Sequence, residues 1–103
     1  MEELKIIKNI IKELEKNNIP TTKVEIYQHL IDMEGIHDID FKDLTEAEQI
    51  KLINLIWDDW TRYEYTEHTL FDYCYGVMEH IKELKEHEFN YKYFNDIVVD
   101  FVV

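Results

Sequence analysis

The sequence has 103 residues and a formal net charge of −12, with 46% hydrophobic and 14% aromatic residues. This length is near that of one domain, and the apolar content is high enough to argue against disorder despite the charge. Only two glycines and one proline occur, which disfavours a turn-rich β architecture. The composition therefore predicts a single all-α domain over residues 1–103, a compact bundle of four to five helices.

The cysteine content and the apolar runs bear on the compartment in which the protein works. Cys74 is the only cysteine, which excludes an intramolecular disulfide, and its apolar helical surroundings are typical of a small buried side chain. The sequence shows no signal-peptide pattern at its start and no run of about 18 apolar residues. We therefore expect a cytoplasmic protein with no membrane partner.

Two amphipathic helices are predicted before residue 36. The first covers residues 2–17 and has apolar residues at spacings of three and four. The second runs from about Lys23 to Met33, after a capping box formed by Thr22 and Glu25 and before Gly35 at its C-terminal cap. Its buried stripe is expected to comprise Val24, Tyr27, Leu30 and Ile31. Residues 36–43 lack a sustained helical period, so we expect a loop whose apolar residues turn inward.

The third helix is predicted to occupy about residues 46–62 and to lie at the centre of the bundle. Thr45 and Glu48 have the spacing of a capping box, which predicts a start at Glu46. The apolar residues that recur along one face are Ile50, Ile53, Trp57 and Trp60, widened by Ile56, with Leu52 and Leu55 off the stripe. A helix that is apolar around most of its circumference is buried on several sides, so we expect both tryptophans to anchor the core.

A fourth helix is predicted to begin at Thr66 and to continue to Leu84. Its apolar stripe comprises Leu70, Cys74, Val77, Met78, Ile81 and Leu84. We expect Phe71, Tyr73 and Tyr75 beside or outside this stripe.

The C-terminal segment, residues 89–103, fits either a helix or a short strand. Phe89, Tyr91 and Tyr93 alternate as in a strand, and the valine-rich composition favours β structure. The residues at helical spacing are Phe94, Ile97, Val98, Phe101 and Val102, with Asn90 available as an N-cap. The helix is favoured, because the chain offers no second good strand as a partner.

The side chains that catalysis or metal binding requires do not occur in suitable patterns. The sequence contains no serine, no glycine-rich phosphate loop and no HExxH motif. The five histidines are His29, His37, His68, His80 and His87, and none has zinc-finger spacing to Cys74. We therefore expect no enzyme activity, no catalytic residue, no metal and no cofactor.

The negative charge is concentrated in the middle of the chain. Residues 24–80 contain fourteen acidic and three basic residues, a net charge of −11, whereas residues 1–23 have a net charge of +1. If the helices bury their apolar faces, these carboxylates lie outside and create a field that repels nucleic acid and attracts basic surfaces. The alternative interpretation is that the charge serves only solubility.

Tyrosines interleaved with acidic residues near the end of the third helix are the candidate partner-binding residues, since tyrosine is enriched at interface hot spots. The candidates are Asp58, Asp59, Tyr63, Glu64, Tyr65, Glu67 and Asp72. We expect the partner to be a host protein with a basic surface, and the protein itself to be a monomer or homodimer.

Two resemblances bear on function. The first helix, the stretch IPTTKVEIYQHL and the second helix, about a third of the chain, resemble the start of a winged-helix or helix-turn-helix domain, which implies a transcriptional regulator acting as a dimer. The next helix departs from that pattern, because a recognition helix carries basic or amide side chains and this one has only Lys51 before Arg62. In size and charge the chain is similar to small acidic phage proteins that inhibit host nucleic-acid enzymes, including anti-CRISPR proteins.

The leading hypothesis is therefore a non-enzymatic acidic inhibitor, encoded by a phage or mobile element, that occupies a basic nucleic-acid-binding surface of a host protein without itself binding nucleic acid. A helix-turn-helix regulator is the alternative.

Overall fold

The computed structural model describes residues 9, 22–62 and 69–102, and every regular element in these residues is helical. The elements are α2 (Thr22–Asp32), the short 3-10 helix η1 (Phe41–Asp43), α3 (Glu46–Arg62), α4 (Leu70–Glu79), α5 (Ile81–Glu86) and α6 (Tyr91–Val102). The predicted all-α bundle is thereby confirmed. Of the helix predicted over residues 2–17, only Asn9 is described, and it is helical. The fourth helix was predicted to start at Thr66, but α4 starts at Leu70, because Thr69 is extended and its hydroxyl accepts from the Asp72 amide at 3.1 Å as the N-cap.

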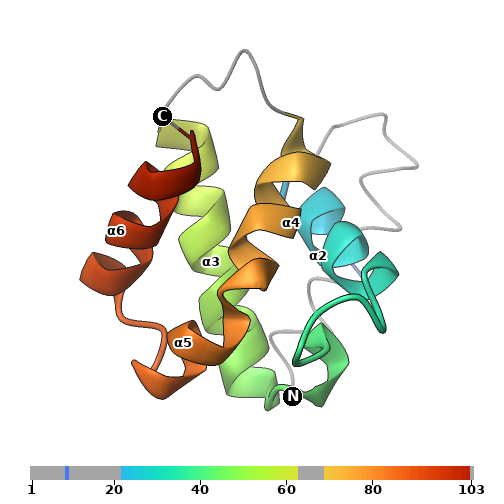
Figure 1. The fold of residues 1–103 in the computed structure, drawn as a ribbon. Helices are drawn as coiled ribbons and strands as arrows, with labels where there is room; N and C mark the ends of the chain where they lie inside the picture. The colour runs from blue at the N-terminus through green and yellow to red at the C-terminus, as the bar shows by residue number, and fades with distance from the viewer. Residues whose placement is uncertain (1–8, 10–21, 63–68, 103) are drawn as a thin grey trace.

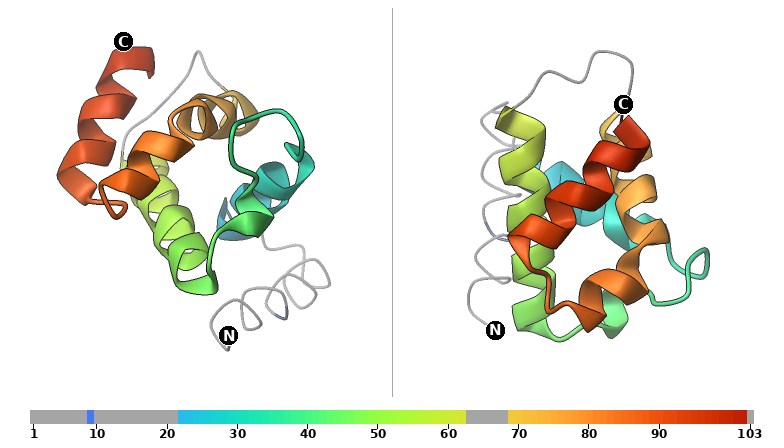
Figure 2. Two further views of the ribbon diagram at one scale, coloured as in Figure 1. Left: turned by 60° about the horizontal axis from the view of Figure 1, so that its bottom comes forward. Right: turned by 60° about the vertical axis from the view of Figure 1, so that its left-hand side comes forward.

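The helices are arranged around α3 and α4. Figure 1 shows α3 passing behind α4 in the middle of the bundle, with α2 on one side and α6 on the other. α2 packs against both α3 and α4, and α6 packs against α4. The right-hand view of Figure 2 shows α6 lying obliquely in front of α3 and α4. α4 therefore has neighbours on two sides and is left with one exposed face.

One continuous hydrophobic core joins the described elements. Residues with essentially no solvent exposure come from each described element: Ile26 and Leu30 from α2, Phe41 from η1, Leu52, Ile53 and Ile56 from α3, Cys74 and Val77 from α4, and Ile81 and Leu84 from α5. Phe94 contributes in the same way from α6. The core thus depends on short stretches from the whole described chain.

Side-chain caps fix where several helices begin and end, as predicted. The Glu48 amide donates to Thr45 Oγ1 at 3.1 Å and the Thr45 amide donates to Glu48 Oε1 at 2.9 Å, which confirms the capping box of α3. Asn90 Oδ1 accepts from the amide of Lys92 at 2.9 Å, so α6 is a capped helix and not a strand. Gly35, in the turn three residues after the end of α2, has a φ of +82°, the left-handed conformation that glycine adopts readily after a helix.

The buried stripe of α3 differs from the predicted one. Its buried residues are Gln49, Leu52, Ile53, Ile56 and Asp59. Trp57, predicted to be a core anchor, is 37% exposed, and Lys23 Nζ lies 4.7 Å from the centre of its ring. The predicted position of Trp57 is wrong because the apolar arc of α3 is wider than the arc that can face the core, and the helix is rotated away from the tryptophan.

Two further segments differ from the predictions. The helix expected to continue to Leu84 is interrupted at His80, whose φ of −108° and ψ of 16° separate α4 from α5. Residues 77–83 contain neither glycine nor proline, so no local signal marks this break. In the loop before α3, Phe41 is buried as predicted, but Ile36 is 52% exposed and does not turn inward.

Replacing a core isoleucine is expected to be far more costly than replacing an exposed one. Ile56→Ala removes a side chain with 0% exposure, and the lost burial and the cavity should lower the free energy of unfolding by about 2–5 kcal/mol. The matched control Ile36→Ala removes the same atoms from an exposed loop and should cost less than about 1 kcal/mol. Urea denaturation followed by circular dichroism measures both values. Equal losses would contradict the assignment of the α3 core face.

Candidate protein-binding face

The residues predicted to bind a partner do not form one surface in the described part of the chain. Asp58 is exposed near the end of α3 and forms an ion pair with Arg62, with 2.9 Å between Oδ2 and Nη2. Its charge is therefore partly neutralised within the protein. Four of the predicted residues lie outside the described residues: Tyr63, Glu64, Tyr65 and Glu67. Asp72 is exposed in the first turn of α4.

Asp59 was predicted to lie on the binding surface, and this prediction is wrong. The residue is only 3% exposed, and the Tyr73 hydroxyl donates a hydrogen bond of 2.6 Å to Asp59 Oδ2. Tyr73, expected beside or outside its stripe, is 1% exposed and also packs edge-on against Trp60. A buried carboxylate is tolerated when it is hydrogen-bonded. The pair therefore joins α3 to α4 inside the core.

The Tyr73 hydroxyl is expected to contribute measurably to stability. Tyr73→Phe keeps the ring but removes one hydrogen-bond donor from the buried Asp59 carboxylate, which should lower the free energy of unfolding by about 1–3 kcal/mol. Tyr75→Phe is the matched control, because Tyr75 lies on the exposed side of the same helix, and it should change stability by less than about 0.5 kcal/mol. Urea denaturation distinguishes the two. A Tyr73→Phe variant as stable as the control would show that the hydrogen bond contributes nothing.

With Tyr73 inside, α4 turns a specific set of side chains outward. The exposed residues of its outer face are Phe71, Asp72, Tyr75 and Glu79. At about 100° per residue these four positions fall within an arc of roughly 100°, opposite the buried arc that contains Tyr73 and Val77. Phe71 is 40% exposed and Tyr75 is 36% exposed, so both rings can be reached from solvent. α4 thus presents two aromatic rings flanked by two carboxylates.

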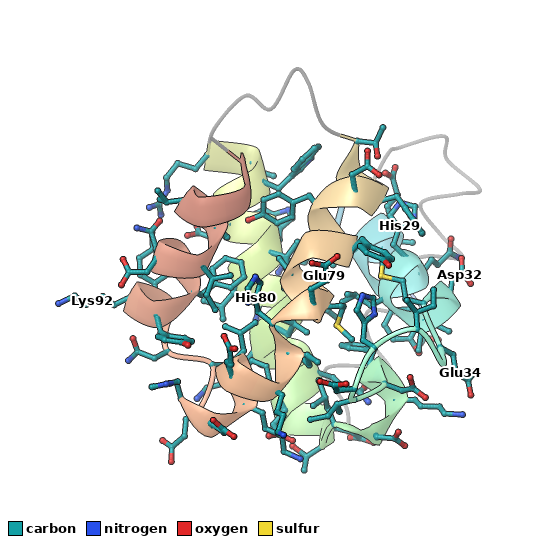
Figure 3. The ribbon with its side chains drawn as sticks, in the orientation of Figure 1. His29, Asp32, Glu34, Glu79, His80 and Lys92 are labelled. Carbon is teal, nitrogen blue, oxygen red and sulfur yellow. The ribbon has the colours of Figure 1, made fainter. Side chains whose placement is uncertain are left out.

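The neighbouring helix α2 extends this surface. The His29 ring contacts the Phe71 ring edge-on, with centroids 5.4 Å apart, and so joins α2 to α4. Glu25 and Asp32 lie one turn to either side of His29 on α2, and both are exposed. Figure 3 shows Asp32 at the outer edge of α2 and Glu79 on the adjacent α4. We name the surface formed by Glu25, Asp32, Phe71, Asp72, Tyr75 and Glu79 the α2–α4 face.

The α2–α4 face is negative because few cations are near it in the sequence, the nearest being Lys23 before Glu25 and Lys82 after Glu79. Residues 24–41 and 63–81 contain neither lysine nor arginine. Lys42, which follows the first of these stretches, pairs with Glu34, and the hydrogen bond and charge of Glu34 raise the pKa of Lys42 above its usual value. In the described residues, none of the four carboxylates of the face forms an ion pair. Glu25, Asp32 and Glu79 were not among the predicted binding residues. Their spacing was the available signal, because residues seven apart lie on the same side of a helix, as Glu25 and Asp32 do on α2 and Asp72 and Glu79 on α4.

Elsewhere in the described residues, we looked for a metal site and for a ligand pocket. No group of three or more His, Cys, Asp or Glu side chains among them is placed to hold a metal ion. An open pocket of about 330 Å³ lies between α3 and α5, lined by Ala47, Glu48, Lys51, Lys85, Glu88 and Phe89. Its Lys51 ammonium donates to the Glu88 carbonyl at 3.4 Å, and Glu48 caps α3. Two of its four charged groups therefore already have structural partners.

Cys74 is expected to be unreactive in the folded protein. Burial raises the pKa of its thiol to about 12, and the thiolate is the form that attacks thiol reagents. At pH 8 the native protein should react with a disulfide reagent such as Ellman's reagent at least about 100-fold more slowly than the same protein in 8 M urea. The absorbance of the released thiolate gives both rates. Rapid reaction of the native protein would contradict the burial of Cys74.

Comparisons with known proteins assign no family to the chain. No protein-family model matches it, and neither the curated proteins nor the solved structures include a similar protein. Among the described helices, none has both the length and the apolar composition needed to cross a bilayer.

Proposed function

We propose that the protein is a non-enzymatic binding protein whose α2–α4 face occupies a basic, nucleic-acid-binding surface of a partner protein. The observation that carries the proposal is the combination, on one face, of two exposed aromatic rings with four carboxylates that form no ion pair in the described residues. Aromatic residues supply most of the energy at interface hot spots, whereas charge complementarity selects the partner and speeds association.

The arrangement of the carboxylates supports a partner that otherwise binds nucleic acid. Asp72 and Glu79 are seven residues apart on α4, so their backbone positions are separated by about 10 Å along the helix axis. Glu25 and Asp32 have the same separation on α2. Two short rows of negative charge can therefore replace phosphates on a surface whose lysine and arginine side chains are spaced for a nucleic-acid backbone. The same field opposes direct binding of nucleic acid by this protein.

The helix-turn-helix alternative gains no supporting observation. In that motif two helices are joined by a turn of three or four residues, whereas residues 33–45 separate α2 from α3. The exposed residues at the ends of α2 include Glu25 and Asp32, which would repel phosphates. We therefore propose no DNA-binding function.

Charge reversal on the α2–α4 face should abolish partner binding. Asp32→Lys with Glu79→Lys changes the charge by +4 at the last residues of α2 and α4, where a lysine also suits the helix dipole. Glu86→Lys with Asp96→Lys makes the same change in charge on α5 and α6 and is the control. Tagged proteins are used to capture partners from a bacterial lysate, and captured proteins are quantified by mass spectrometry.

A nucleic-acid-binding protein should be retained by the wild type and the control and lost by the double variant of the face. Its affinity should fall as salt is raised from 50 to 500 mM, because complementary charges are screened. Duplex DNA should compete for the partner. Equal capture by the face variant would contradict the proposed function, as would a shift of duplex DNA by the protein alone.

A further inference from the structure

Within the protein, the guanidinium of Arg62 is bound by a carboxylate and a tyrosine. Arg62 Nη2 contacts Asp58 Oδ2 at 2.9 Å, and Arg62 Nη1 donates to the Tyr91 hydroxyl at 2.8 Å. The Arg62 guanidinium carbon also lies 5.9 Å from the centre of the Tyr91 ring. A carboxylate and an exposed tyrosine ring thus share one arginine at the surface.

The α2–α4 face repeats these side chains without an arginine. Tyr75 lies three residues after Asp72 and four residues before Glu79, so each carboxylate is one helical turn from the ring. The separation of four residues between Tyr75 and Glu79 equals that between Asp58 and Arg62. No arginine or lysine occurs within residues 63–81 to occupy the position between them. The face has the acceptors and the ring, and Glu79 forms no ion pair with Lys82, the nearest lysine after it, so an arginine of another molecule can supply the cation.

We propose that the α2–α4 face binds arginine side chains of a basic partner segment, with one guanidinium stacked on Tyr75 between Asp72 and Glu79. This inference rests on the proposed function and specifies the chemistry of the partner. Phe71 provides a second ring, which His29 holds from α2 at a centroid distance of 5.4 Å. A second guanidinium can stack on Phe71, next to α2.

Arginine fits this surface better than lysine for geometric reasons. A planar guanidinium can lie flat on an aromatic ring while its edge donates to a carboxylate, whereas an ammonium is a compact and strongly hydrated charge. Stacking on an exposed ring contributes about 0.5–1 kcal/mol, which corresponds to roughly two- to fivefold in affinity for each ring. A purely electrostatic surface would not distinguish the two cations.

The test compares two peptides of equal charge, acetyl-hexaarginine amide and acetyl-hexalysine amide, by isothermal titration calorimetry at 50 and 150 mM salt. The wild type should bind hexaarginine about two- to fivefold more tightly than hexalysine for one occupied ring, and more for two. Tyr75→Leu, which keeps an apolar side chain but removes the ring, should reduce this ratio toward one. Tyr91→Leu removes an equally exposed tyrosine from α6 and should leave the ratio unchanged.

Equal affinity of the wild type for the two peptides would overturn the arginine inference, as would a preference that survives Tyr75→Leu. If both peptides bind equally and Asp32→Lys with Glu79→Lys abolishes both, the acidic face of the proposed function stands and only the arginine inference fails. Analytical ultracentrifugation tests whether a second copy of the protein, and not a basic partner, covers the α2–α4 face. A wild-type dimer that Tyr75→Leu dissociates would show that a second copy covers the face, and would also overturn the inference.

Discussion

The hydrogen bond between Tyr73 and Asp59 fixes the rotation of the two helices around which the described structure is arranged. The Asp59 carboxylate of α3 is buried, and the hydrogen bond that it accepts from Tyr73 favours the rotation of α4 that turns Tyr73 toward α3. Once Tyr73 is inside, the helical period puts Cys74, Val77 and Met78 in the core. The same rotation leaves Phe71, Asp72, Tyr75 and Glu79 on the outside. One interior contact therefore determines the composition of the exposed face.

The distribution of charge follows from this arrangement and from where the few cations lie. Arg62 and Lys42 each pair with a nearby carboxylate, so part of the negative charge is neutralised locally. The α2–α4 face lies in stretches without basic residues and keeps its charge. A net charge of −12 spread evenly would serve solubility alone, whereas an uneven distribution around exposed rings favours recognition.

Features that depend on neighbouring residues could be predicted from the sequence, and features that depend on distant ones could not. The cap at Thr45 and the helix after Asn90 were predictable because both involve hydrogen bonds across three residues or fewer. The burial of Asp59 depends on Tyr73, a residue fourteen positions away. From the sequence alone, a charged residue near the end of a helix is expected to be exposed. The prediction that Trp57 lies in the core was wrong for a related reason. The apolar arc of α3 spans both the observed and the predicted stripes, and packing against α2 and contacts with Tyr73 of α4 select between them.

The same distinction explains why the candidate site was found only in part. Asp72 was identified from its tyrosine neighbours in the sequence, but Glu25 and Asp32 join it only because α2 packs beside α4. The contacts between the helices also affect binding. The Phe71 ring rests against His29, and the Tyr75 ring lies 4.7 Å from the His37 ring in the loop after α2. Rings that are already held lose less conformational freedom when a partner binds, so more of their contact energy appears as affinity. Exposure of these aromatic residues is therefore compatible with a rigid binding surface, and their supports come from α2 and the loop that follows it.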